Sequence, residues 1–159
     1  AAVWSYPVNK QIKEPVTDEV VVMNMCNAML GRIHLSSYIN ELTDFQFELV
    51  KDGLQAYKDT REFKKNSLPI FPNGISYFYD KDVVGGLINK SKIVLCVWNT
   101  SGISRKIKVN LHKYNIKSLS VSYPKTIKTD YEYNQNKKEL YVNFDVPYGG
   151  RVFEIDLEK

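Results

Sequence analysis

The sequence predicts an α+β protein in which a helix–strand–helix segment precedes a mainly antiparallel β-sandwich. Apolar residues recur at helical spacing in the first part of the chain and alternate with polar residues at strand spacing in the rest. Between the two parts, the polar stretch 62–67 is followed by Pro69 and by Pro72-Asn73-Gly74, which together mark a boundary. We therefore expect two regions, residues 1–65 and residues 66–159.

The first helix is predicted by its start signal and its composition. Thr17 is a candidate N-cap, and Asp18 and Glu19 follow in the first turn, where the positive end of the helix dipole favours acidic side chains. Residues 20–30 are apolar on nearly every side, which predicts a buried helix that stops near Gly31.

A short strand and a second helix follow. Residues 33–35 are a brief apolar run, and Thr43-Asp44-Phe45-Gln46 fits a capping box that begins a helix reaching Arg61. A buried helix, a short buried strand and a covering helix are together typical of the closing part of an α/β barrel. One such piece cannot bury its own apolar surface, so we expect the helices to fold back onto the sandwich or to pair between two chains.

The remainder has the alternation and the turn signals of an antiparallel sandwich. The predicted strands lie at 83–88, 93–98, 106–111, 119–123, 131–133, 140–144 and 153–157. Asn89-Lys90-Ser91 and residues 134–138 predict hairpin turns, and Gly85-Gly86 predicts a bulge.

Composition excludes two classes of partner. Apolar residues make up 43% of the chain and charged residues 25%, as in ordinary globular proteins, and the net charge of +4 is too small to predict nucleic-acid binding. Lys106 and Lys108 alternate with apolar residues, as on the solvent face of a strand. No run reaches the ~18 apolar residues that span a bilayer. The chain opens onto Trp4 and Tyr6 without signal-peptide features, so we expect a cytoplasmic, bacterial-type protein.

Few residues offer metal or nucleophile chemistry. His34 and His112 have no Cys, Asp or Glu nearby at metal-ligand spacing and no paired nucleophile, so we expect no metal site. Cys26 and Cys96 lie in apolar runs and are expected to be buried free thiols. Asn99-Thr100-Ser101 fits the N-glycosylation pattern, which matters only in a secretory setting.

Several segments carry a family resemblance. Residues 27–61, NAMLGRIHLSSYINELTDFQFELVKDGLQAYKDTR, resemble the end of the catalytic barrel in family-36 glycoside hydrolases, the α-galactosidases and their relatives. In that family a helix leads into the eighth barrel strand, followed by a small-residue turn and a helix with a YK..R ending. Residues 2–7 are similar to the loop segment before the first of these helices. Residues 68–72 and 150–155 resemble the family's C-terminal β domain.

The resemblance implies that the chain is the C-terminal fragment of a retaining α-galactosidase-like enzyme that needs no cofactor. The family's two catalytic aspartates lie on earlier barrel strands, so we expect no catalytic residue here and no activity of the fragment alone. The candidate carboxylates, Asp80 and Asp82 on a turn and Asp156 and Glu158 on an outward strand face, are expected to be solvated charges. The implied partners are the rest of the barrel, an α-galactoside bound by the whole enzyme, and further copies in a homo-oligomer.

Some residues could border the substrate. Barrel enzymes bind substrate at the carboxyl ends of their strands, where Ser36, Ser37 and Tyr38 would lie. Trp4 and Tyr6, in the preceding loop, could stack on the sugar. The competing interpretation is that Trp4 and Tyr6 pack on the buried helix and that Tyr38 covers the core.

A non-catalytic carbohydrate-binding or interaction module is the alternative class. Eleven tyrosines are present, and Tyr77, Tyr79, Tyr131 and Tyr133 could form an aromatic platform. An exposed row of aromatic residues on one sheet face would favour this module. An aromatic set facing the helices would favour a sandwich that braces the barrel.

Overall fold

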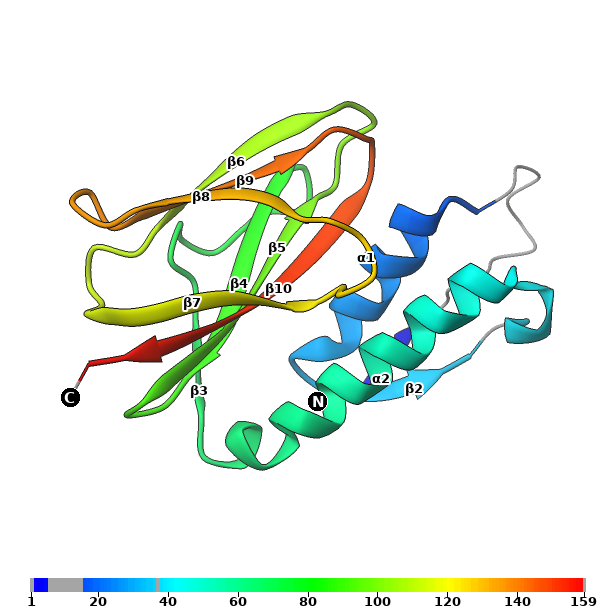
Figure 1. Ribbon diagram of the computed structural model, residues 1–159, viewed down its shortest axis with the longest axis horizontal. Helices are drawn as coiled ribbons and strands as arrows, with labels where there is room; N and C mark the ends of the chain where they lie inside the picture. Colours follow the sequence, from blue (N-terminus) through cyan, green and yellow to red (C-terminus); the bar gives the residue numbers. More distant parts are fainter. Residues whose placement is uncertain (1, 6–15, 37, 159) are drawn as a thin grey trace.

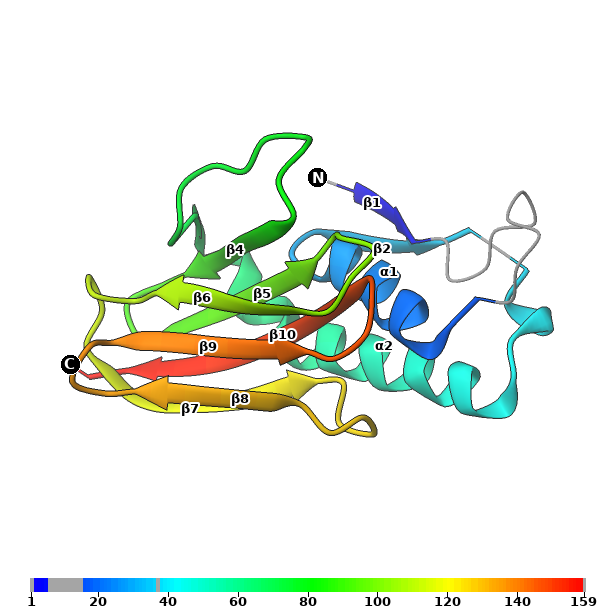
Figure 2. The same ribbon diagram turned by 90° about the horizontal axis from the view of Figure 1, so that it is seen from above.

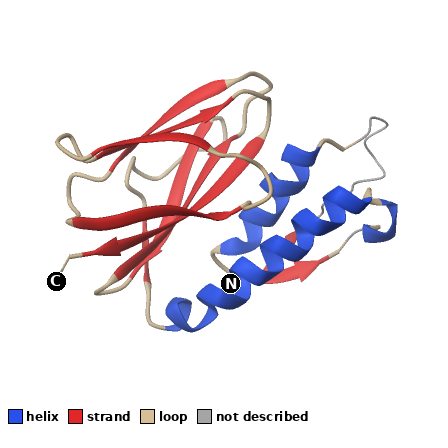
Figure 3. Ribbon diagram, viewed as in Figure 1, coloured by secondary structure: helices blue, strands red, loops and turns tan. Residues whose placement is uncertain are grey.

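The computed structural model describes residues 2–5, 16–36 and 38–158 and has three layers (Figures 1 and 3). Two helices cover one face of a five-stranded sheet, and a three-stranded sheet covers the other face. The helices are α1 (Asp18–Met29), the short 3-10 helix η1 (Ile39–Glu41) and α2 (Asp44–Lys65). The strands are β1 (Ala2–Ser5), β2 (Arg32–Leu35), β3 (Leu68–Ile70), β4 (Asp82–Ile88), β5 (Lys92–Asn99), β6 (Arg105–Asn110), β7 (Ile116–Tyr123), β8 (Asp130–Asn134), β9 (Glu139–Phe144) and β10 (Gly149–Leu157).

Both predicted helix starts are confirmed. The Thr17 side chain accepts a hydrogen bond from the Val20 amide at the start of α1, and Thr43 and Gln46 form the capping box of α2. The helix α2 runs to Lys65, four residues beyond the predicted end, because charged residues are good helix formers on an exposed face. The composition change at residue 62 therefore does not end the helix.

The segment before α1 differs from the prediction. Residues 2–5, expected in a loop, form β1, which pairs in parallel with β2 from Ala2 opposite Arg32 to Ser5 opposite Leu35. The order β1–α1–β2 is a βαβ unit. Four residues are too short a run to reveal a strand by alternation. In the described part of the chain, this parallel sheet has only these two strands (Figure 2).

The antiparallel strands agree with the sequence. The five-stranded sheet has the order β3-β4-β5-β10-β7 and the three-stranded sheet the order β6-β9-β8, with every neighbouring pair antiparallel. Each predicted strand is present, and both predicted hairpin turns join neighbouring strands. The strand β3 was not predicted, because Pro69 marked a boundary. Proline is tolerated there because β3 is an edge strand.

The five-stranded sheet is buried on both faces. On β5, Ile93, Leu95 and Val97 pack in the core between the two sheets. Val94, Cys96 and Trp98 pack in a second core under the helices. The continuous apolar run of β5 follows from this position. The helix α1 packs on β10 and β5, and α2 packs on α1 and β7, which confirms that the helices fold back onto the sandwich.

The predicted bulge at Gly85-Gly86 is wrong. The register between β4 and β5 is continuous, with Gly85 opposite Cys96 and Gly86 opposite Leu95. Glycine is needed at position 86 for a different reason. A Cβ atom at Gly86 would lie 2.7 Å from the Val94 carbonyl oxygen. Gly86 therefore permits a close approach of two backbones rather than an extra residue.

The cysteines are free and buried, as predicted. Both pack in the core under the helices, and burial raises the pKa of the Cys26 thiol and of the Cys96 thiol. Gly150 allows α1 to approach β10, because a Cβ atom at this position would lie 2.8 Å from the Cys26 sulfur.

Candidate functional site

The parallel pair β1–β2 places two of the predicted substrate-binding segments together. Trp4 lies opposite His34 in the register, and Ser36 directly follows β2. Because the two strands are parallel, their carboxyl ends lie at the same end of the pair. In barrel enzymes, substrates bind at the carboxyl ends of the strands.

The structure describes only some of the predicted substrate-binding residues. Tyr6 and Ser37 lie outside the described residues, and so does the side chain of Trp4. Ser36 is half-buried, and Tyr38 precedes η1 with 50% of its side chain exposed. This exposure does not decide between a substrate contact and a Tyr38 ring that covers the core. A substrate-binding role for these five residues stays a prediction.

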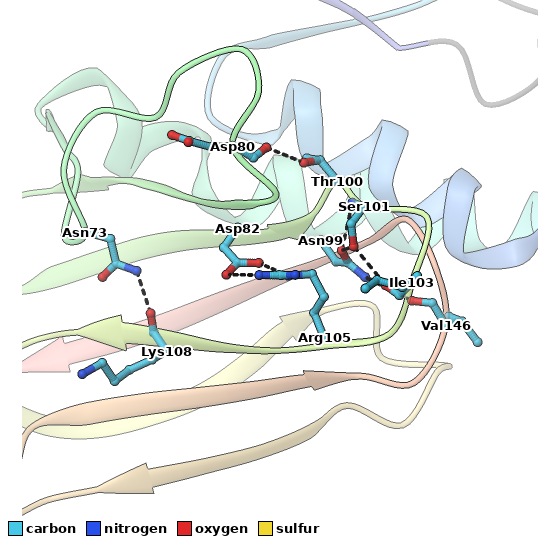
Figure 4. A network of polar contacts seen from close by, with 10 residues as sticks. All are labelled: Asn73, Asp80, Asp82, Asn99, Thr100, Ser101, Ile103, Arg105, Lys108 and Val146. Carbon is cyan, nitrogen blue, oxygen red and sulfur yellow. Dashed lines mark hydrogen bonds and ion pairs between the residues drawn. The ribbon is translucent and has the colours of Figure 1, made fainter.

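The candidate carboxylates are not arranged as a catalytic pair. Asp82 was expected to be a solvated charge, but its carboxylate forms an ion pair with Arg105, whose Nη2 lies 2.9 Å from Oδ2 (Figure 4). The pair joins β4 to β6 across the two sheets. The Asp80 carboxylate accepts a hydrogen bond from the Tyr77 amide at 2.7 Å and closes a turn. Asp156 and Glu158 are exposed, as expected.

Asn99 has a structural role. Its side chain is completely buried, and its amide nitrogen donates to the carbonyl oxygens of Ile103, at 2.8 Å, and Val146. Its Oδ1 accepts hydrogen bonds from the Ser101 amide and hydroxyl (Figure 4). A glycan could not be attached to Asn99 in the folded protein. The glycosylation pattern marks instead the buried residue that organises the β5–β6 turn.

A cavity of about 720 Å³ lies beside the start of α1, and the sequence did not predict it. Its walls are residues 16–20, Met23, Asn24 and 146–148. Neither Ser36 nor Tyr38 lines it. The Glu19 carboxylate in its wall is engaged, since each oxygen accepts a hydrogen bond from Arg151 at 2.7 Å. The cavity wall is mainly apolar, and its other carboxylate, Asp18, accepts a hydrogen bond from the Gln46 side chain at 3.1 Å.

The described part of the chain contains neither a cluster of metal ligands nor a membrane-spanning helix. No three His, Cys, Asp or Glu residues of this part come together as metal ligands. His112 is exposed and lies 3.9 Å from the Glu139 carboxylate. None of the described helices combines the length and the apolar character that a membrane span requires.

The most exposed aromatic residues, Tyr77, Phe78 and Tyr79, lie on a loop rather than on a sheet face. Tyr131 is 36% exposed, and its ring centroid lies 5.3 Å from that of buried Phe153. Tyr133 packs on the core between the sheets, so the two do not form an exposed row. Tyr77 and Tyr79 are 80% and 81% exposed in the connection between β3 and β4. We call residues 71–79 the aromatic loop.

No protein-family model matches the chain, and no curated protein matches it in sequence. Solved structures do resemble its fold. The GH36 α-galactosidase AgaA from Geobacillus stearothermophilus, in complex with 1-deoxygalactonojirimycin, matches 99% of the chain with a TM-score of 0.62 and 15% identity. An α-amylase from Anoxybacillus matches 87% of the chain with a TM-score of 0.62 and 6% identity.

The chain spans only part of these proteins, 22% of the α-galactosidase and 32% of the α-amylase. At these identities the likeness is one of fold. The structural neighbours are glycoside hydrolases that are several times longer than the matched segment.

Proposed function

We propose that this chain is the C-terminal segment of a longer, retaining α-galactosidase-like glycoside hydrolase. Residues 1–65 complete the catalytic barrel, and residues 66–159 form the sandwich that supports it. The whole enzyme hydrolyses terminal α-galactosides without a cofactor, and the catalytic aspartates lie on barrel strands upstream of this chain. The observation that carries the proposal is the parallel β1–α1–β2 unit.

The βαβ unit supports a barrel because two parallel strands are not a stable sheet. Parallel strands occur almost only in larger sheets that are covered on both faces, and a barrel leaves no strand edge unpaired. In the described residues, β1 and β2 each pair on one side only. Further parallel strands on both outer edges would complete the sheet, and a (β/α)8 barrel supplies them.

The sandwich supports the position of the last barrel strand through α1. Arg151 of β10 binds Glu19 in the first turn of α1, and Gly150 lets the helix lie against the sheet. The same helix leads into β2, whose carboxyl end carries Ser36, Ser37 and Tyr38. The sandwich therefore fixes the carboxyl ends of β1 and β2, where Trp4, Tyr6 and these three residues would meet the galactoside.

The test is hydrolysis of a chromogenic α-galactoside by two proteins. One is this chain, and the other is the extended protein, in which the reading frame continues upstream through the whole barrel. Activity of the extended protein alone is the expected result. Activity of the short chain would contradict the proposal, because it would require a catalytic pair within these residues. Inactivity of both proteins, on α-galactosides and other α-glycosides, would favour the non-catalytic carbohydrate-binding module.

A further inference from the structure

The aromatic loop is the most exposed apolar feature of the described structure. Ile75 is 74% exposed, Phe78 93% and Tyr79 81%, within five consecutive residues. Soluble proteins rarely expose apolar side chains in such a group unless the group contacts a partner. The rings carry large apolar surface and would be strong anchors in an interface.

Hydrogen bonds to the sandwich hold this loop at both ends (Figure 4). At its start, the Asn73 side chain donates to the Lys108 carbonyl oxygen at 2.6 Å and accepts from the Asn110 amide at 2.9 Å. Just beyond its end, the Thr100 hydroxyl donates to the Asp80 carbonyl oxygen at 2.8 Å. The loop is thus fixed before it meets a partner, which lowers the entropy cost of binding.

The chemistry of the loop fits a protein surface better than a sugar. The Phe78 and Tyr79 rings are perpendicular, at 86°, and do not make a flat platform for a pyranose. Ile75 adds an aliphatic side chain, which cannot stack on a sugar. The amide of Asn73 and the carboxylate of Asp80 already hold the loop in place.

The position of the loop identifies the partner. Figure 2 shows the loop between β3 and β4 on the same side of the molecule as β1, whereas α2 lies on the opposite side. The outer edge of β1 is unpaired in the described chain, so both features face the region that further barrel strands would occupy. We propose that the aromatic loop docks on the upstream part of the catalytic barrel and locks the sandwich to it. This inference rests on the proposed function.

The inference is tested by the accessibility of residue 78. Phe78→Cys is introduced into the short chain and into the extended protein, and maleimide labelling of the residue-78 peptide is followed by mass spectrometry. Because the native Cys26 and Cys96 are buried, they should stay unlabelled in the folded protein. We expect labelling in the extended protein to be slower by about tenfold or more. The matched control is Phe47→Cys on α2, where Phe47 is 43% exposed and labelling should be equal in both proteins.

Equal labelling of residue 78 in both proteins would overturn the inference. Labelling of the short chain that slows with protein concentration would assign the loop to a second copy instead. Protection of the short chain by raffinose would assign it to carbohydrate. The proposed function fails separately: protection of residue 78 in an inactive extended protein keeps the docking and rejects the α-galactosidase. Activity of the extended protein without protection of residue 78 supports the α-galactosidase and rejects the docking.

Discussion

At the scale of single residues, one buried ion pair joins the helices to the sandwich. The Arg151 and Glu19 side chains are only 5% and 13% exposed, and two hydrogen bonds of 2.7 Å connect them. A buried pair of this kind adds little net stability over an apolar pair, but the loss of one partner leaves a charge buried without compensation. The pair therefore makes the position of α1 on β10 sensitive to a single substitution.

Replacement of Glu19 should be severe. We expect Glu19→Gln to lower the free energy of unfolding by about 3–5 kcal/mol, measured by urea denaturation, because the Arg151 charge stays buried. The control is Glu62→Gln, which breaks an exposed pair with Lys65 of the same 2.7 Å length and should cost less than about 1 kcal/mol. Equal effects of the two substitutions would contradict this account.

Lys64 should make stability depend on pH. Burial lowers the pKa of its ammonium group from 10.5 to about 8, and Nζ lies 3.9 Å from the centre of the Tyr57 ring. The unfolded chain thus binds the proton more tightly, so the folded state is penalised below pH 8 and the penalty disappears as the pH rises towards 10.5. We expect Lys64→Met to be more stable than the natural chain at pH 7, with an advantage that shrinks by about 1–3 kcal/mol up to pH 10.5.

The measurement is the difference between the two proteins in urea denaturation at several pH values. Cys26 and Tyr123 also have raised pKa values, but they titrate in both proteins and cancel in the difference. Cys96 interacts with the Lys64 charge, so both proteins carry Cys96→Ala in this comparison. An advantage that does not change with pH would show that the Lys64 ammonium group is not destabilised by burial.

Substitution of Tyr38 tests whether the carboxyl end of β2 contacts the substrate. We expect Tyr38→Ala in the extended protein to lower kcat/KM by about 10- to 100-fold, because a ring at the carboxyl end of β2 would contact the galactoside. Its side chain is 50% exposed, so the melting temperature should hardly change. Unchanged kinetics would remove Tyr38 from the site.

At the scale of elements, the sequence predicts long or periodic segments well and short ones poorly. The capped helices and the strands with alternating residues, such as β6 and β9, follow from local chemistry. The strands β1 and β3 were missed, because four residues and a proline-containing triplet hold no period. The Gly85-Gly86 pair was misread for another reason: sequence cannot distinguish a bulge from the close approach of a neighbouring strand.

The two glycines of β4 should therefore respond oppositely. A Cβ atom on Gly86 would lie 2.7 Å from the Val94 carbonyl oxygen, whereas a Cβ atom on Gly85 would make ordinary contacts at 3.8 Å or more. We expect Gly86→Ala to destabilise the protein by about 1–3 kcal/mol. Gly85→Ala should be neutral or stabilising by up to about 1 kcal/mol, because it reduces the entropy of the unfolded chain. Thermal unfolding of both variants distinguishes the two sites, and the reverse order would contradict the backbone contact.

At the scale of the whole molecule, the sequence predicted the layers but only part of the candidate site. The switch from helical to strand spacing located the helices and the sandwich. The cavity beside α1, the Asp82–Arg105 pair and the aromatic loop depend on contacts between distant segments, such as Arg151 with Glu19. No local pattern reports such contacts. The resemblance to family-36 glycoside hydrolases came from sequence segments, and the structural neighbours support it at the level of fold only.

The central claim is that β1 and β2 are strands of a barrel that the upstream sequence completes. The most direct measurement is hydrogen exchange of the backbone amides of residues 2–5 and 32–35 in the short chain and in the extended protein. If the outer edges of both strands pair in the barrel, these amides should exchange about tenfold more slowly, or slower still, in the extended protein. Equal exchange in the two proteins would show that the edges stay unpaired and would contradict the barrel.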